Sequence, residues 1–217
     1  MVSRETCPPP VVAGTVFGDR LPAAHRYAEE LATTGVEWGL IGPRETARLW
    51  TRHIVNCAVI EEVIPQGASV IDVGSGAGLP GIPLALARPD LEVLLVEPME
   101  RRVRWLERII PQLGVPVRVL RARAEETTEQ ADVVTSRALA PIGKLLDWSL
   151  PLVRPGGRVV AVKGRSVQDE LRKYRHQLTE LGNPVIEVCC CGTGILDEPA
   201  TVVTAYPRAG RPRRSGP

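Results

Sequence analysis

The sequence lacks long apolar runs: nothing in its 217 residues approaches twenty consecutive apolar positions. Its first ten residues, MVSRETCPPP, have neither the apolar segment nor the cleavage site of a secretory signal. We therefore expect a soluble cytoplasmic protein. The five cysteines contain no CxxC pair, and their odd number supports neither a zinc site nor a disulfide framework. We expect reduced thiols and no metal, including in the apolar run PVIEVCCCG at 184–192.

An excess of positive charge is nearly absent as well. The formal net charge is +2, and four arginines in the last ten residues carry +4, so the remainder carries about −2 (2 − 4). Such a body is not a globally basic nucleic-acid binder. Residues 207–217 are rich in Gly, Pro and Arg, and we expect a disordered tail that adds unspecific attraction to phosphate or only solubility. We expect residues 1–20 to be disordered too.

What remains is ordinary globular composition, with 44% hydrophobic and 24% charged residues, which predicts one domain over residues 21–206. Apolar spacing predicts a helix over 21–31 and a longer one from Pro43 to Ile64, so that 21–64 form an N-terminal helical extension. Residues 65–206 alternate between the apolar spacing of strands and that of helices, as in a parallel sheet covered by helices.

This core has seven expected strands. They lie at 69–73, 93–97, 117–120, 131–137, 158–163, 184–191 and 201–206, the last two as an antiparallel hairpin. Helices are expected at 81–88, 99–113, 144–152 and 166–181. Met99, Val103, Leu106, Ile110 and Leu113 form the buried stripe of the second, and Ser166 with Asp169 approximates a capping box at the start of the last. The fold class is α/β, with a mostly parallel sheet.

The stretch VIDVGSGAGLPG at 70–81 places spaced glycines after an apolar strand, as in loops that hold a nucleotide at a helix N-terminus. Residues 76–81 match GxGxxG, so an NAD(P)-dependent oxidoreductase has to be considered. Asp72 instead gives the DxGxGxG form typical of S-adenosylmethionine-dependent methyltransferases, and its charge would repel a pyrophosphate. Glu97 ends the second strand, where a carboxylate accepts ribose hydroxyls of either cofactor.

The layout as a whole separates these cofactors. Seven strands with a final antiparallel hairpin are the order of class I (Rossmann-like) methyltransferases, whereas a dinucleotide fold has six parallel strands. We therefore predict S-adenosyl-L-methionine as the cofactor. The structural alternative is that the glycines and prolines only form a turn between strand and helix.

The segment SRALAP at 136–141 bears on the methylated atom, because it follows the fourth strand. It contains neither the [DN]PP[YF] motif of exocyclic-amine methyltransferases nor the Pro-Cys pair of cytosine-C5 enzymes. Arg137 suits an acceptor that already has a lone pair, such as guanine N7, which lies beside O6 and requires no general base. An ion pair between Arg137 and Glu125 is the structural alternative.

Taken together, VGSGAGLPGIPLALARP, RVRWLERI, ARAEE, SRALA, VAVKG and the earlier RHIVNCAVI closely resemble the RsmG (GidB) family. These are bacterial methyltransferases that make N7-methylguanosine in small-subunit ribosomal RNA. The resemblance covers residues 20–206. It implies that the chain methylates a specific guanosine of 16S ribosomal RNA, in the small subunit or its precursor. We expect it to act as a monomer. A noncatalytic RNA- or nucleotide-binding assembly factor remains a further alternative.

The resemblance also implies site residues. Gly74, Leu79, Ala124, Glu125 and Arg137 would line the cofactor site, where the glycine loop adds Ser75, Gly76 and Gly78 to Asp72 and Glu97. Arg137 would position the substrate. The residues implied to face the RNA are Arg52, His53, Lys163 and Arg165, and Arg44, Arg48 and Arg52 would form a basic stripe. That stripe could be a solvated helix face with Glu45 paired to Arg48, His53 could be a packing residue, and Glu125 could lie in a solvated acidic turn.

Two departures from the family pattern concern the N-terminal part. Residues 38–41 read Trp-Gly-Leu-Ile where many members have Asn-Leu-Thr, and Asn56-Cys57 replaces Asp-Ser. The cofactor loop is unaffected.

Overall fold

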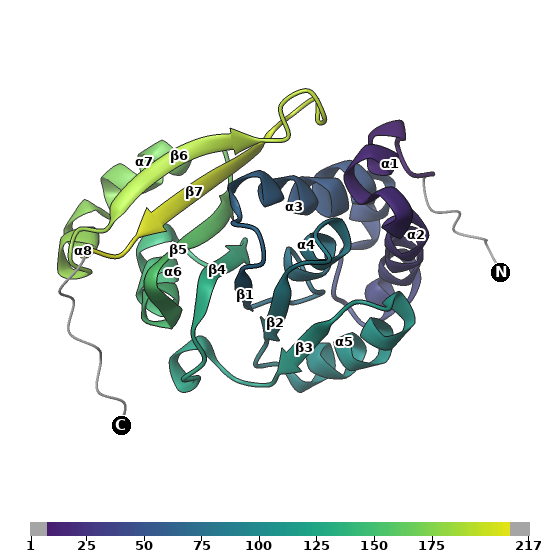
Figure 1. Cartoon of the computed structure of the whole chain (residues 1–217), viewed down its shortest axis with the longest axis horizontal. Helices are drawn as coiled ribbons and strands as arrows, with labels where there is room; N and C mark the ends of the chain where they lie inside the picture. The colour runs from purple at the N-terminus through teal and green to yellow at the C-terminus, as the bar shows by residue number, and fades with distance from the viewer. Residues whose placement is uncertain (1–7, 209–217) are drawn as a thin grey trace.

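The structure is a computed structural model that describes residues 8–208. Within them the strands form one seven-stranded sheet (Figure 1), in the order β3-β2-β1-β4-β5-β7-β6. The first five strands along the chain are parallel, and β7 runs antiparallel to both β5 and β6. Their bounds are β1 Ser69–Val73, β2 Glu92–Val96, β3 Val117–Leu120, β4 Ala131–Arg137, β5 Val153–Lys163, β6 Val185–Cys191 and β7 Ala200–Tyr206. The predicted fold class is confirmed.

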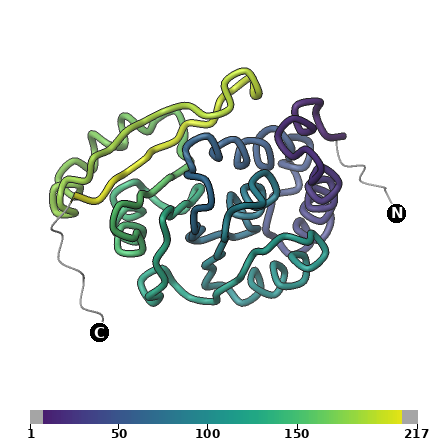
Figure 2. The backbone as a smooth tube through the Cα atoms, in the orientation of Figure 1, coloured from purple at the N-terminus to yellow at the C-terminus, as the bar shows by residue number. Residues whose placement is uncertain are grey.

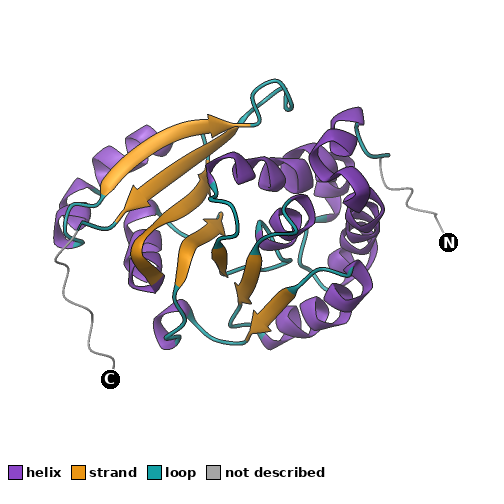
Figure 3. Cartoon of the chain, in the orientation of Figure 1, coloured by secondary structure: helices purple, strands orange, loops and turns teal. Residues whose placement is uncertain are grey.

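Helices cover the strands on both sides (Figure 3). The α-helices are α1 Val11–Phe17, α2 Leu21–Glu30, α3 Asn56–Ala58, α4 Gly81–Ala87, α5 Glu100–Leu113, α6 Ile142–Ser149, α7 Val167–Lys173 and α8 Arg175–Glu180. Alternate strand residues separate two apolar cores. Val70 packs with the N-terminal helices, α4 and α5, and the next residue, Ile71, packs with α6 and α7. This period of two is what a sheet buried on both faces requires.

The N-terminal segment differs from expectation. We expected residues 1–20 to be disordered, but Val11–Phe17 is helical and Ala13 and Phe17 are buried. The Phe17 ring meets the Trp50 ring edge-on at 6.4 Å, so an apolar anchor that lies far away in sequence stabilises this helix. Residues 1–7 and the tail 209–217 lie outside the described residues.

Two predicted helices are interrupted. The segment expected as one helix from Pro43 to Ile64 is divided into η3 Pro43–Arg48, η4 Leu49–Val55, α3 and η5 Val59–Val63. The apolar residues whose spacing predicted that helix are nevertheless buried. The last helix divides at Tyr174 into α7 and α8, and the Ser166 side chain makes no capping bond. Met99, expected in the stripe of α5, is exposed, because it precedes the helix rather than lying in it.

The N-terminal extension lies against the glycine-loop half of the molecule. In Figure 2 these helices, in purple, lie on the right, and the last strand, β7, runs toward the left of the view. α2 contacts α4 and α5, and the buried Tyr27 hydroxyl donates to the Ala77 carbonyl at 2.7 Å. The extension is thereby attached to the loop after β1. β1 lies between β2 and β4, the switch point at which open α/β sheets bind ligands.

None of the helices in residues 8–208 is both long and apolar enough to cross a membrane. The same residues contain no group of three or more His, Cys, Asp or Glu side chains arranged to hold a metal ion.

Candidate cofactor and substrate site

The glycine loop after β1 is held in a conformation that suits glycine. Gly74, Gly76 and Gly78 have φ values of +68°, +57° and +88°, in the region that L side chains avoid. The amides of Gly74 and Ser75 donate to the Val96 carbonyl at the end of β2, at 2.8 and 3.3 Å. The loop therefore spans the ends of two neighbouring strands.

The glycines differ in what surrounds them. A Cβ on Gly78 would lie 2.4 Å from Ile82 Cδ1, and one on Gly81 would lie 2.4 Å from Leu95 Cδ2 and 2.9 Å from Asp72 Oδ2. These two positions permit close packing of α4 on the sheet. A Cβ on Gly76 would meet only a carbonyl oxygen, 3.9 Å away. The backbone at Gly76 is consequently open to a ligand.

Asp72 is a buried carboxylate with one unused oxygen. Its Oδ2 accepts a 2.9 Å hydrogen bond from the Gly81 amide at the start of α4, whereas Oδ1 has no partner among the described residues. Burial raises the pKa of Asp72 to about 7; the Gly81 bond opposes the rise and the charge of Glu97 adds to it. A positively charged ligand group near this carboxylate would favour its ionised form.

Glu97 follows β2 directly and is buried beside the same loop. Its Oε2 accepts from the Gly76 amide and its Oε1 from the Met99 amide, both at 2.9 Å, and Arg102 Nη1 lies 3.5 Å from Oε2. The predicted ribose acceptor is therefore fixed against the glycine loop. Oε1 accepts only the Met99 bond among the described residues, so its second lone pair remains available to a hydroxyl.

The segment after β4 covers the loop. A Cβ on Gly74 would lie 2.3 Å from Leu139 Cδ1, so the leucine side chain packs directly against the Gly74 backbone. Ala138, between Arg137 and Leu139, has φ +51°, which is unusual for a residue other than glycine. Leu139 was not predicted as a site residue, and only its place in SRALA pointed to it.

Arg137 lies at the end of β4 and reaches across to the N-terminal extension. Its Nη1 donates to Cys57 Sγ at 3.2 Å and its Nη2 to the Arg52 carbonyl at 2.8 Å. The alternative ion pair with Glu125 is not formed. The guanidinium is held at these two points, and no carboxylate among residues 8–208 forms an ion pair with it.

Cys57 bonds to Arg137, and Tyr27 lies near Asp72. Sequence reasoning gave neither residue a site role. Both are fully buried. Burial raises the pKa of the Cys57 thiol, and the Arg137 charge opposes this. Burial also raises the pKa of Tyr27. Both groups are therefore neutral hydrogen-bonding partners near pH 7. The Asn56-Cys57 departure from the family pattern was the one available signal for Cys57.

Ala124 and Glu125 form the short turn η6 Ala124–Glu126 after β3. Ala124 is buried and Glu125 is exposed. The turn is closed by the Arg123 amide, which donates to Glu126 at 3.1 Å. In the part of the chain that the structure describes, no hydrogen bond or ion pair joins Glu125 to the glycine loop, so its contact with an adenine edge stays a prediction.

Three of the basic residues expected to face RNA gather around one acid, Glu45. Glu45 contacts Arg48 and Arg52 at 3.4 Å each and His53 Nε2 at 2.9 Å. Burial lowers the pKa of His53, with the Arg137 charge acting in the same direction, whereas the His53 hydrogen bond lowers the pKa of Glu45. His53 is thus a mostly buried, neutral donor to Glu45 near pH 7. Arg48 and Arg52 keep more than half of their side chains exposed.

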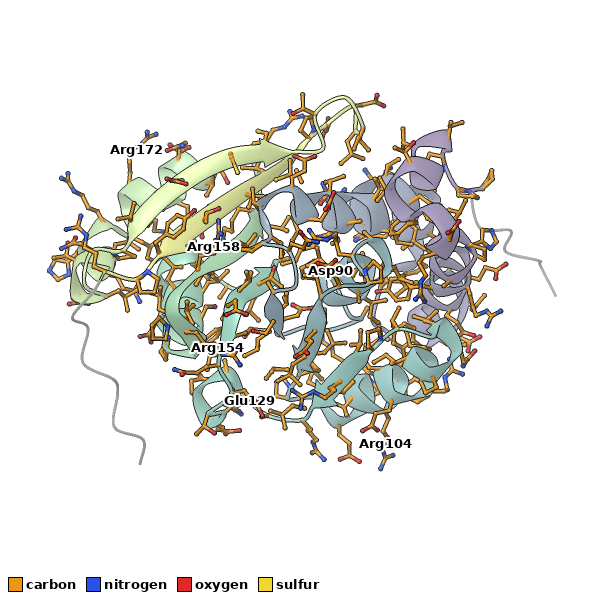
Figure 4. All side chains as sticks on the ribbon, viewed as in Figure 1. Asp90, Arg104, Glu129, Arg154, Arg158 and Arg172 are labelled. Carbon is orange, nitrogen blue, oxygen red and sulfur yellow. The ribbon has the colours of Figure 1, made fainter. Side chains whose placement is uncertain are left out.

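Lys163 and Arg165, predicted together, have opposite environments. Lys163 is only 10% exposed, and its amine bonds to Glu170 and to the Ala140 carbonyl. It therefore does not face solvent as an RNA contact would. Arg165 is 81% exposed and pairs with the equally exposed Glu198 at 2.9 Å. Other arginines lie far from the site: Arg104 and Arg172 point away from the body at opposite ends (Figure 4).

The sheet order, the glycine loop and the two acids define a class I methyltransferase. Comparison with solved structures agrees at the level of fold. The chain resembles a precorrin-6y C5,15-methyltransferase from Geobacter metallireducens with a TM-score of 0.52 and 17% identity, over 70% of this chain and 87% of that one.

The family follows from sequence comparison. The model of the GidB family, rRNA small subunit methyltransferase G, matches residues 20–198, and the chain belongs to this family. It is 50% identical to ribosomal RNA small subunit methyltransferase G of Mycolicibacterium gilvum, over 99% of this chain and 100% of that one. It is 53% identical to the protein of the same name from Rhodococcus jostii, over 89% and 87%. The nicotinamide and noncatalytic alternatives gain no support.

Proposed function

We propose that this protein transfers a methyl group from S-adenosyl-L-methionine to N7 of a guanosine in 16S ribosomal RNA. One observation carries the proposal within the family. Asp72, a buried carboxylate with an unused oxygen, lies beside the open Gly76 backbone at the switch point of the sheet, and Arg137 ends the strand next to β1. The names of the relatives supply the substrate class.

The residues present fit this cofactor better than a dinucleotide. S-adenosylmethionine carries an ammonium and a sulfonium, which two buried acids, Asp72 and Glu97, would favour. The charge of Asp72 would repel a pyrophosphate, whereas Glu97 would accept a ribose of either cofactor. Asp72 would hold the amino-acid end and Glu97 the ribose, while Leu79, Ala124 and Glu125 remain predicted contacts. When bound, the cofactor supplies an electrophilic methyl carbon.

The reaction that the site supports requires no base. The N7 lone pair forms the new carbon–nitrogen bond, the sulfur–carbon bond breaks and its electron pair stays on sulfur, so no proton leaves the guanine. The protein has to align the two reactants. Arg137, fixed by Cys57 and the Arg52 carbonyl, would donate to guanine O6 or to a phosphate. Because the guanine loses no proton, His53, which is bound to Glu45, is not required as a general base.

The surface supports recognition of a folded RNA rather than of arbitrary strands. The exposed cations predicted to face the RNA are Arg44, Arg48, Arg52 and Arg165, and the last three each form an ion pair with an acid. A partly neutralised surface gives little unspecific affinity, so recognition must depend on shape. We expect an intact small subunit or its precursor to be a far better substrate than a short oligonucleotide. Equal turnover of both would contradict this expectation.

Two experiments test the proposal. Calorimetry should show binding of S-adenosylhomocysteine and negligible binding of NAD or NADP; the reverse result would restore the oxidoreductase alternative. Mass spectrometric mapping of 16S RNA should find one N7-methylguanosine in cells with this protein that is absent from cells without it. An unchanged map, together with binding of the protein to subunits, would indicate an assembly factor.

A further inference from the structure

A mostly buried ion pair lies behind the segment that carries Arg137. Lys163, the last residue of β5, and Glu170, in α7, approach each other at 2.9 Å between Nζ and Oε2 and 3.0 Å between Nζ and Oε1. Their side chains are only 10% and 20% exposed. Charges removed from water to this extent are costly unless their remaining hydrogen-bonding capacity is used.

That capacity is used on a single loop. Lys163 Nζ also donates to the Ala140 carbonyl at 3.1 Å, and Glu170 Oε1 accepts from the Ile142 amide at 2.7 Å. The two backbone groups are two residues apart, in the connection from β4 to α6. The ion pair therefore holds this connection at two points. Lys163, in β5, binds the carbonyl, and Glu170, in α7, binds the amide.

The connection requires such support, because its backbone is strained next to the site. Ala138 adopts φ +51°, a left-handed conformation that is unfavourable for a residue with a Cβ. The strained residue joins Arg137, whose guanidinium reaches Cys57, to Leu139, whose methyl group packs on Gly74. Both flanking side chains depend on the position of this loop.

We propose that Lys163 and Glu170 are positioning residues that hold the 138–142 loop, so that Leu139 forms a wall of the cofactor site and Arg137 keeps its orientation. This inference rests on the proposed function. It replaces the expectation that Lys163 contacts RNA, and it assigns a role to Glu170, which the sequence did not single out. Neither residue touches the reacting groups.

The test compares Lys163→Met, Glu170→Gln and the double variant with the wild-type chain. Each single change removes the charge pairing but keeps a side chain of similar size, and glutamine still offers an oxygen to Ile142. We expect each to weaken S-adenosylhomocysteine binding about tenfold and to lower kcat, because small displacements of aligned groups are costly. The double variant should be no worse than Lys163→Met, while affinity for the small subunit changes less than twofold.

Matched controls come from an exposed ion pair on α7 itself. Arg172→Gln and Asp169→Asn remove a pair whose side chains are about three-quarters exposed, and neither should alter cofactor affinity. Circular dichroism and thermal unfolding confirm that each variant is folded at the assay temperature. If Lys163→Met does not fold, Glu170→Gln decides alone, with Glu170→Ala as its more severe counterpart.

Two results would overturn the inference. One is a Lys163→Met variant that loses subunit binding while its cofactor affinity is unchanged and Glu170→Gln resembles wild type, since Lys163 would then contact RNA. The other is a pair of variants with lower melting temperatures but unchanged cofactor affinity and kcat, which would leave a structural role only. Failure of the wild-type chain itself to bind S-adenosylhomocysteine would instead contradict the proposed function.

Discussion

The two halves of the site use their charged groups in opposite ways. On the glycine-loop side, Asp72 keeps an unused oxygen and Gly76 an open backbone. On the substrate side, Glu45 collects Arg48, Arg52 and His53, and Glu170 collects Lys163. The first half is arranged for a small ligand. The second is mostly occupied by its own ion pairs, whereas Arg137 bonds to Cys57 and to the Arg52 carbonyl.

This difference explains why basic residues in the sequence are a poor guide to RNA contacts on the substrate side. A basic residue in a motif is a weaker candidate for a phosphate contact when it is buried against an acid, as Lys163 is against Glu170, seven residues away on another element. Burial, not residue type, decides which of Lys163 and Arg165 reaches solvent. The predictions below alter one half at a time.

The largest effect is expected at Arg137. Arg137→Ala should lower kcat for methyl transfer by on the order of a hundredfold or more, the scale of lost positioning. Arg137→Lys should recover little, because one ammonium cannot reproduce the two-point hold on Cys57 and the Arg52 carbonyl. Single-turnover rates with saturating subunits measure this. A rate within threefold of wild type for Arg137→Ala would remove Arg137 from the mechanism.

Asp72 should connect cofactor affinity to pH. Its pKa in the folded chain is about 7, above the ordinary value of 3.8, so the folded state holds a proton that the unfolded state releases between these values. Stability from this group is therefore lost as pH rises from about 4 to 7. The cofactor's ammonium favours the ionised form, so affinity should rise about tenfold between pH 6 and pH 8.

Asp72→Asn separates the two consequences. The variant should unfold at a higher temperature than wild type at pH 8, with a smaller advantage at pH 5, and its cofactor affinity should be lower and nearly independent of pH. Calorimetry and thermal melts across this range provide both curves. A wild-type affinity that stays flat from pH 6 to pH 8 would mean that Asp72 does not face the cation.

Cys57 should give a smaller effect. Cys57→Ala removes one of two groups that hold the Arg137 guanidinium, and we expect kcat to fall about threefold to tenfold, the value of a single hydrogen bond. Cys57→Ser restores an acceptor and should recover most of the rate. If serine and alanine behave alike, cavity formation rather than the bond to Arg137 accounts for the loss.

Arg48 should give the smallest effect. Arg48→Gln removes an exposed cation beside Glu45 and should weaken subunit binding about twofold to threefold, with a slightly lower salt dependence. Arg104→Gln, which removes an exposed cation paired with Glu100 in α5, is the matched control and should change neither (Figure 4). Identical salt dependence in all three chains would show that the basic stripe is only a solvated helix face.

The sequence predicted the fold well where the signals are local. The bounds of β1, β3 and β4 agree with the structure, because apolar runs flanked by glycine, proline and charged residues identify strands. The glycine loop followed from positions that need positive φ. The helix α1 was missed because its stabilising contacts, such as Phe17 with Trp50, join residues distant in sequence.

The site was predictable to a similar extent. Asp72 and Glu97 lie where their spacing from the glycines placed them, next to the loop. Leu139, Tyr27 and Cys57 could not be found, since their proximity to Gly74, Ala77 and Arg137 depends on how the N-terminal extension and the β4–α6 connection pack. The burial of Lys163 against Glu170 could not be predicted for the same reason.

Reconstituted methyl transfer tests the central claim most directly. Purified protein would be incubated with S-adenosylmethionine carrying a ¹³C-methyl group and with small subunits from cells that lack this protein, and the RNA would then be mapped by mass spectrometry. We expect one labelled methyl per subunit, on N7 of a single guanosine, and near-complete loss of label with Arg137→Ala. Label on another atom or another base, or no label from a chain that binds both cofactor and subunit, would contradict it.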